Sequence, residues 1–441
     1  MKRHNYFSAI ILTILFLSFS AYAETARDIT GKTTIECYGI DEEKILDNDI
    51  STISGGTNVK VTIYPNEEIG GIYIKYNNFS SKGTLNEEIK LGENGFIHEF
   101  VPLSGTDKVT LSYPYVSICD IMIFSQGNMP KDIQLWQTGN SKTDILLCST
   151  HSDDDQLFFA GLLPYYAGVK KANVRVAYFA NHYDTHNRTH ELLDGLWECG
   201  VTNYPDILPF PDGWSESVDE AINHLKNNGF SYDDIISEQK KLIEKYTPLV
   251  VVLHDFDGEY GHGAHMLNTK SFIEAIECGT SYVPEKIYVH LYKENEITLD
   301  IDTPLEEFGG LTAFQVSQKA FEHHKSQHWT WLYEWLYGKN KNKTHSSQIR
   351  SYHPSKFGLY HSRIGKDTNK NCILENVTLY SQRKTVLPEV ETEHGTIPTT
   401  NLSIHHEQKE ESFSILPYTL YFVLILIIAT IIFKLIKRKK R

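Results

Sequence analysis

The chain has 441 residues, of which 41% are hydrophobic and 22% are charged, so two or three folded domains are expected and general disorder is excluded. Acidic residues outnumber basic ones by 56 to 42, which gives a net charge of −14. This excess argues against nucleic acid or an anionic membrane surface as a partner of the main body. The six cysteines form no Cys-x-x-Cys pair, which disfavours a zinc site built from thiolates.

Residues 1–23 are typical of a secretory signal peptide. Lys2 and Arg3 precede an apolar stretch, and the stretch ends in a small-x-small cleavage pattern, Ala21-Tyr22-Ala23. We expect cleavage before Glu24. An uncleaved anchor is the alternative, although the apolar stretch is short for a complete membrane span.

Residues 24–138 are predicted to form a small all-β sandwich. Residues 59–64 and 72–76 alternate between apolar and polar side chains, and no helical periodicity intervenes. The segment 45–52 resembles the Asp-rich loop of discoidin-like, galactose-binding sandwiches. That resemblance implies carbohydrate binding at the loops, while a packing or spacer domain is an equally open alternative. Cys37 and Cys119 are candidates for a disulfide within this domain.

Residues 139–385 alternate between strand and helix signals. The strand candidates are 145–148, 174–179, 249–253 and 287–292, and a helix over 188–199 is closed by Gly200. This order predicts a Rossmann-like α/β domain with a mostly parallel sheet and helices on both faces. The aromatic stretch 328–337 is predicted to be a buried helix, with the wall of a sugar-binding groove as the alternative.

The remaining residues predict a membrane anchor. Residues 386–412 are polar and acidic and read as a linker, and residues 413–434 contain an apolar run long enough for one transmembrane helix. Residues 435–441 are a basic tail, which favours a cytoplasmic carboxyl terminus. We therefore expect a single-pass protein of the cell membrane whose catalytic domain lies outside the cytoplasm.

Two polar clusters follow predicted strands of the α/β domain. The first reads His151-Ser152-Asp153-Asp154-Asp155, and the second reads Gly261-His262-Gly263-Ala264-His265. In an open α/β sheet, sites form beyond the carboxyl ends of the strands, which is where both clusters are predicted to lie. Imidazole and carboxylate groups together suit zinc, and a spare carboxylate suits a general base.

At these residues the chain resembles the PIG-L/LmbE-like family of zinc-dependent de-N-acetylases. The family has a His-Pro-Asp-Asp-Glu motif and a later Gly-His-x-x-His motif, and its Arg-x-x-Glu helix is similar to the segment from Arg188 to Glu191. The resemblance covers about residues 140–385. Two departures, Ser152 for proline and Asp155 for the final glutamate, concern the rigidity of the turn more than the chemistry.

The resemblance implies a role for each matching residue. One Zn²⁺ is held by His151, Asp154 and His265, and Asp153 is the general base toward a zinc-activated water. His262 stabilises the oxyanion, and either Asp153 or His262 protonates the departing amine. Arg188 and Glu191 are implied to contact the substrate, and an ion pair between these two residues is an equal alternative.

The implied activity is removal of the N-acetyl group from an N-acetylglucosamine-type sugar or glycoconjugate outside the cell membrane. Two alternatives stay open: a zinc amidase acting on a non-sugar amide, and a non-catalytic glycan-binding protein of the cell surface. His182, His186 and His190 are spaced by four residues, but residues 181–187 read as a loop before the helix, so we expect solvated histidines there and not a second metal site.

Overall fold

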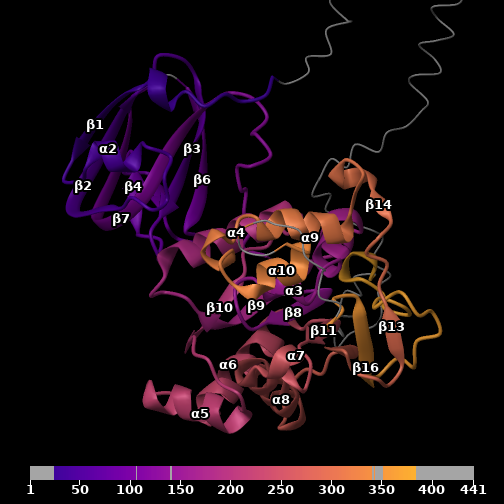
Figure 1. Ribbon diagram of the computed structural model, residues 1–441. Helices are drawn as coiled ribbons and strands as arrows, with labels where there is room; N and C mark the ends of the chain where they lie inside the picture. Colours follow the sequence, from indigo (N-terminus) through magenta and orange to yellow (C-terminus); the bar gives the residue numbers. More distant parts are fainter. Residues whose placement is uncertain (1–23, 106, 140–141, 340–341, 343–350, 384–441) are drawn as a thin grey trace, which may run out of the picture. The chain divides into compact units, whose positions relative to one another are not determined.

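The computed structural model describes residues 24–105, 107–139, 142–339, 342 and 351–383 (Figure 1). They fall within one compact unit that ends at Arg383, and they form an all-β domain followed by an α/β domain. The predicted signal peptide lies outside the described residues. The same is true of the predicted linker, the transmembrane helix and the basic tail.

The all-β domain is one antiparallel sheet. Its strands are β1 (Thr34–Tyr38), β2 (Ser54–Tyr64), β3 (Ile69–Tyr76), β4 (Gly83–Leu85), β5 (Ile89–Leu91), β6 (His98–Gly105) and β7 (Val109–Ser125). Two short helices precede β2, η1 (Thr30–Lys32) and α2 (Glu42–Ile45). The strand order is β1-β2-β7-β3-β6, with β4 also on β7 and β5 on β4. Strand β7 pairs with β2 along its first half and with β3 along its second, so it joins all the strands into one hydrogen-bonded sheet. The predicted sandwich would instead have two separate sheets.

The described residues of the α/β domain form nine strands. They are β8 (Ile145–Ser149), β9 (Val174–Asn181), β10 (Asp206–Pro211), β11 (Val250–Leu253), β12 (Lys286–His290), β13 (Glu296–Thr298), β14 (Pro304–Leu305), β15 (Leu311–Thr312) and β16 (Lys356–Ser362). The main sheet has the order β10-β9-β8-β11-β12-β16-β13. Its first five strands are parallel, while β16 runs antiparallel to both β12 and β13. The four predicted strands coincide with β8, β9, β11 and β12.

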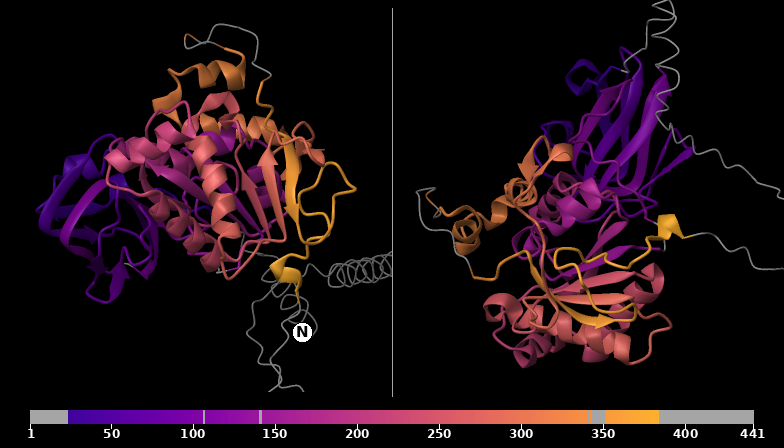
Figure 2. Two further views of the ribbon diagram at one scale, coloured as in Figure 1. Left: turned by 90° about the horizontal axis from the view of Figure 1, so that it is seen from below. Right: turned by 90° about the vertical axis from the view of Figure 1, so that its right-hand side faces the viewer.

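Helices cover both faces of this sheet (Figures 1 and 2). The longer ones are α4 (His186–Glu198), α5 (Val218–Asn227), α6 (Tyr232–Tyr246), α8 (Gly263–Glu277) and α9 (Ala313–Phe321). The shorter ones are α3 (Asp154–Leu157), η2 (Pro164–Val169), α7 (Gly258–Gly261), η3 (Glu306–Phe308), η4 (Lys325–Gln327), α10 (Trp331–Tyr337) and η5 (Tyr380–Gln382). Along β8, Ile145 and Leu147 join one apolar core, with residues of α4 and α9, and Leu146 and Cys148 join another, with residues of α5, α6 and α8. A strand buried on both faces explains the unbroken apolar run in its sequence.

The predicted fold class needs two corrections. The amino-terminal domain is one continuous antiparallel sheet instead of a two-sheet sandwich, and the main sheet of the α/β domain is mixed, because β13 and β16 add antiparallel pairing that the βαβ pattern of the sequence did not signal. No helix in the part of the chain that the structure describes is long and apolar enough to cross a membrane, and the predicted transmembrane helix over residues 413–434 lies outside that part.

Helix α4 lies between the all-β domain and the rest of the α/β domain. His190 Nδ1 is 2.7 Å from His98 Nε2, Gln134 donates to Asp194 at 2.6 Å, and the Trp197 indole donates to a backbone carbonyl of residue 131 at 2.6 Å. Residues 190, 194 and 197 share one helical face. None of the described side chains of α4 is exposed. The all-β domain therefore covers the face of α4 that would otherwise be in solvent.

Two smaller predictions have definite outcomes. All six cysteines lie in the described residues and none forms a disulfide, Cys37 and Cys119 included. The aromatic stretch contains α10, which buries Leu332, Tyr333, Trp335 and Leu336 as a buried helix should, but Trp329 and Trp331 are exposed.

Candidate metal centre

All five parallel strands deliver a polar side chain to one edge of the sheet. β8 is followed by His151, β9 by His182, β10 by Asp212 and β11 by His254, and β12 ends at His290. This edge is the carboxyl end of the strands, where sites of open α/β sheets form.

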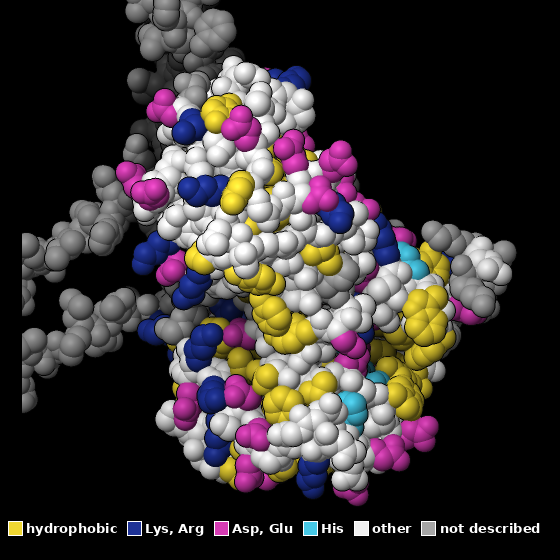
Figure 3. Space-filling view, turned by 90° about the vertical axis from the view of Figure 1, so that its left-hand side faces the viewer, with side chains coloured by type: hydrophobic (Ala, Val, Ile, Leu, Met, Phe, Trp, Pro, Cys, Tyr) yellow, Lys and Arg dark blue, Asp and Glu magenta, His cyan; other side chains and the backbone are white. Residues whose placement is uncertain are grey.

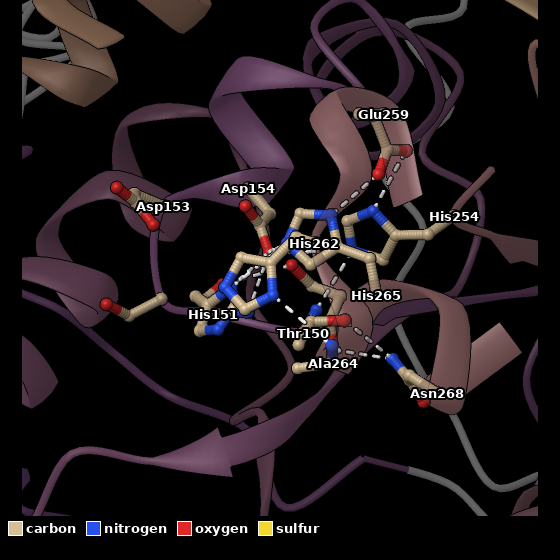
Figure 4. Close-up of polar contacts among 12 residues, drawn as sticks. Thr150, His151, Asp153, Asp154, His254, Glu259, His262, Ala264, His265 and Asn268 are labelled. Carbon is tan, nitrogen blue, oxygen red and sulfur yellow. Dashed lines mark hydrogen bonds and ion pairs between the residues drawn. The ribbon is translucent and has the colours of Figure 1, made fainter. Parts of the chain in front are cut away.

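Three donor atoms of the predicted metal ligands form a nearly equilateral triangle (Figure 4). His151 Nδ1 is 3.1 Å from Asp154 Oδ2 and 3.1 Å from His265 Nε2, and His265 Nε2 is 3.2 Å from Asp154 Oδ2. Zinc binds such atoms at about 2.0–2.1 Å in tetrahedral geometry, so neighbouring ligand atoms should lie about 3.3 Å apart. All three side chains are buried. The spacing therefore fits one small divalent cation, with a coordination position left for water or substrate.

The other nitrogen of each of these two histidines faces a carboxylate. His151 Nε2 is 3.2 Å from Asp212 Oδ1, and His265 Nδ1 is 2.6 Å from Glu259 Oε2. A carboxylate only accepts hydrogen bonds, so His265 Nδ1 carries a proton and its Nε2 can offer a lone pair to a metal, while His151 Nε2 lies within ion-pair distance of Asp212. Metal-binding histidines are commonly oriented in this way.

Two further histidines lie within reach of a metal but have their lone pairs engaged elsewhere. Other triplets within 4.8 Å combine His262 with His151 and His265, or His254 with Asp154 and His265. However, His254 Nε2 accepts the backbone N–H of residue 150 at 3.0 Å, and His262 Nδ1 accepts that of residue 264 at 3.2 Å. His262 is thus left with a proton on Nε2, which makes it a hydrogen-bond donor toward the site.

Asp153 lies beside the triangle, and its two carboxylate oxygens have different surroundings. Its Oδ1 is 3.4 Å from an Arg188 guanidinium nitrogen, while its buried Oδ2 has no hydrogen-bond partner among the described residues. The second guanidinium nitrogen of Arg188 is 3.4 Å from Asp212 Oδ2 and 3.2 Å from His182 Nδ1. Arg188 therefore contacts both the predicted base and the carboxylate behind His151.

Burial and neighbouring charges shift the pKa values at this site. Burial raises the pKa of Asp153, and Arg188 opposes the rise. Burial would also raise the pKa of Asp154, but His265 and His151 hold it well below its usual range. Burial, His151 and His265 lower the pKa of His262 to about 2, so its ring is neutral at physiological pH.

The backbone between β11 and α8 is bent to bring Glu259 under the site. Glu259 has φ 53° and ψ −81°, a conformation that costs a non-glycine residue roughly 1–3 kcal/mol, and Gly261 has φ +87°. The contacts of the Glu259 side chain hold it there. Besides His265, its carboxylate contacts His254 Nδ1 at 3.1 Å, His290 Nδ1 at 2.9 Å and a backbone N–H at 3.0 Å.

The structure brings together six of the seven residues singled out from the sequence: His151, Asp153, Asp154, Arg188, His262 and His265. Glu191 is placed differently. Its carboxylate accepts the backbone N–H and the hydroxyl of Ser326 at 2.9 and 2.6 Å, and Arg188 pairs with Asp153 and Asp212 instead.

Sequence reasoning assigned no role to four residues of the site: Asp212, His254, Glu259 and His290. The predicted solvent exposure of His182 and His190 is wrong, because both are buried. A polar residue directly after each parallel strand is the signal that would have found Asp212, His254 and His290.

Two of the larger cavities among the described residues lie away from the site. One cavity of about 520 Å³ lies on the all-β domain beside Lys60 and Lys82. Another of about 750 Å³ lies at the amino end of the parallel strands, beside Asp144 and Asn173. The donor geometry, and not cavity volume, marks the site.

No protein-family model matches the chain, and no curated protein matches it. Among solved structures, a deacetylase of teicoplanin biosynthesis is 15% identical over 49% of this chain and 98% of its own, with a TM-score of 0.31. A 4-carboxy-2-hydroxymuconate hydratase of Pseudomonas putida is 15% identical over 51% and 99%, with a TM-score of 0.31. The N,N′-diacetylchitobiose deacetylase of Pyrococcus horikoshii is 14% identical over 42% and 70%, with a TM-score of 0.28. Since these scores are low, we infer function from the geometry of the site.

Proposed function

We propose that the chain is a metal-dependent hydrolase that removes the N-acetyl group from an N-acetylglucosamine-type sugar, with zinc as its metal. The observation that carries the proposal is the triangle of His151 Nδ1, Asp154 Oδ2 and His265 Nε2, with edges of 3.1 to 3.2 Å. The resemblance of its two motifs to zinc-dependent de-N-acetylases supports this reaction class.

The protein groups around the triangle suit amide hydrolysis. Zinc in this position would lower the pKa of a bound water toward about 7 and polarise the amide carbonyl. Asp153 Oδ2, which is buried and has no hydrogen-bond partner among the described residues, accepts the proton of the attacking water, while Arg188 holds Oδ1. His262 donates from Nε2 to the oxygen that becomes negative. The proton on Asp153 then passes to the amine as the C–N bond breaks, which gives acetate and an amino sugar.

The test is acetate release by the full-length chain from N-acetylglucosamine and its oligomers. The zinc-loaded protein should release acetate, chelation should abolish this activity, and added zinc should restore it. Asp153→Asn should retain stoichiometric zinc while losing activity by about 10²- to 10⁴-fold.

The other outcomes are equally informative. Zinc-loaded protein that releases no acetate from any sugar would redirect the search to non-sugar amides. A chain that binds neither zinc nor any other divalent ion would contradict the proposal. An Asp153→Asn variant of normal activity would remove Asp153 from its role as the base.

A further inference from the structure

Three aromatic side chains lead from the candidate metal centre to the surface. Trp214, in the loop after β10, has its ring centroid 4.7 Å from that of His262 and stacks on Tyr260 at 6.1 Å with an interplanar angle of 14°. Trp331 of α10 meets the Tyr260 ring edge-on at 5.2 Å. We call these three side chains the aromatic rim. They come from three different elements of the fold, and two of them, Trp214 and Tyr260, contact His262 of the site.

The rim exposes apolar surface next to buried polar groups. Trp214 is 63% exposed and Trp331 is 42% exposed, whereas the neighbouring His262 is only 5% exposed. Figure 3 shows hydrophobic side chains next to histidines on one face of the molecule. A cluster of exposed aromatic side chains beside a site is typical of a binding surface, because exposing these rings to water does not help the chain to fold.

The mixture of apolar and charged groups at the rim indicates which kind of ligand binds there. Asp212 lies two residues before Trp214 and its side chain is 32% exposed, and Arg188 lies beside it. A ligand for this surface needs an apolar face for the rings and polar edges for the charged groups. A pyranose ring has both, since its C–H groups form a face and its hydroxyls lie around the edge. An alkyl chain has no partner for the charged groups.

The length of the rim sets the size of the ligand. The ring centroids of Tyr260 and Trp214 lie 5.7 and 4.7 Å from that of His262. Trp331 lies one ring farther out, against Tyr260. A sugar whose acetamide reaches His262 therefore lies along Trp214 and Tyr260. We infer that Trp331 binds the neighbouring sugar unit, so that the preferred substrate is an oligosaccharide and not a monosaccharide. This inference rests on the proposed function only where it places the acetamide of the sugar at His262.

The experiment measures binding separately from catalysis. Calorimetric titration of the full-length, zinc-loaded Asp153→Asn chain with N-acetylglucosamine and with its β-1,4 tetramer gives two affinities. In that background, Trp331→Ala should weaken tetramer binding roughly fivefold to tenfold, the worth of one aromatic contact, and leave monomer binding unchanged. Trp214→Ala should weaken the binding of both sugars. The matched control is Trp329→Ala, which removes a 75% exposed tryptophan two residues from Trp331 and should change neither affinity.

Each remaining result decides the inference. Equal tetramer affinity with and without Trp331, or an equal loss in Trp329→Ala, would overturn it. Tighter binding of octyl glucoside than of the tetramer would assign the rim to an alkyl chain instead. Tetramer binding that depends on Trp331, in a protein that releases no acetate, would retain the glycan site and reject only deacetylation.

Discussion

Replacing Glu259 by glutamine tests whether the charge behind His265 sets the affinity for the metal. The carboxylate accepts four hydrogen bonds in the structure, one from His265 Nδ1 and three from His254, His290 and a backbone N–H. Glutamine has nearly the same shape but only one oxygen. Whichever way its amide is turned, an N–H group faces at least one buried donor.

The structure allows the magnitude to be worked out in two ways. Losing a buried hydrogen bond to a charged acceptor costs about 1.5–3 kcal/mol, which is roughly a 10- to 150-fold change in an equilibrium constant. Removing a group that orients a metal-binding histidine typically lowers metal affinity by about 10–100-fold. Because the two figures agree, we expect Glu259→Gln to weaken zinc binding by about 10–100-fold.

Competition with a chromophoric zinc chelator at fixed pH measures this affinity. The matched control is Glu99→Gln in the all-β domain, a buried carboxylate that accepts hydrogen bonds from Tyr76 and Gly92 and lies outside the site. The control should bind zinc as the wild type does. Wild-type affinity in Glu259→Gln, or the same loss in both variants, would refute the reasoning.

Three further predictions concern stability and can be followed by urea denaturation. Lys286→Met leaves the buried Asp367 carboxylate without its cation and should lower the free energy of unfolding by about 3–5 kcal/mol. A second change, Asp367→Leu, should restore most of this loss. Burial raises the pKa of Asp120 from 3.8 to about 6, so its proton is held more tightly in the folded state and the stability this provides is lost as pH rises through 6. Asp120→Asn should therefore match the wild type near pH 4 and exceed its stability above pH 6 by up to about 3 kcal/mol; a constant difference across this range would exclude that pKa. Gly261→Ala places a side chain at φ +87° with nothing within 4 Å of its Cβ, so backbone strain alone should cost about 1–2 kcal/mol, and an unchanged stability would show that the loop relaxes freely.

The sequence predicted those parts of the molecule that follow from local patterns. Strand β11 is a continuous apolar run and β8 nearly so, β9 and β12 are largely apolar, and helix α4 ends before Gly200, whose φ is +81°. The polar clusters after β8 and β11 could be placed at one edge of the sheet, because parallel strands end together. Their three metal-binding candidates meet at about 3.1 Å for that reason.

Other features depend on contacts between distant segments. Asp212 follows β10, a strand with the mixed sequence of residues 206–211, and nothing local shows that it pairs with β9 and places a carboxylate behind His151. His190 lies on a helix face that reads as solvated until the all-β domain covers it with His98. The edge strand β13 has only three residues, and β16, between β13 and β12, pairs with a register shift, and antiparallel pairing leaves no signature in a βαβ pattern.

The position of α4 means that few of its residues can be substituted without disturbing a contact. On one side His190, Asp194 and Trp197 contact the all-β domain, and on another Arg188 contacts the site. A solvent-facing stripe, where most helices accumulate substitutions harmlessly, is missing among its described residues. Selection on the junction between domains and selection on the catalytic edge therefore act on the same thirteen residues. The two domains should have been inherited as a pair, and exchanging the all-β domain for a relative's would require compensating changes along α4.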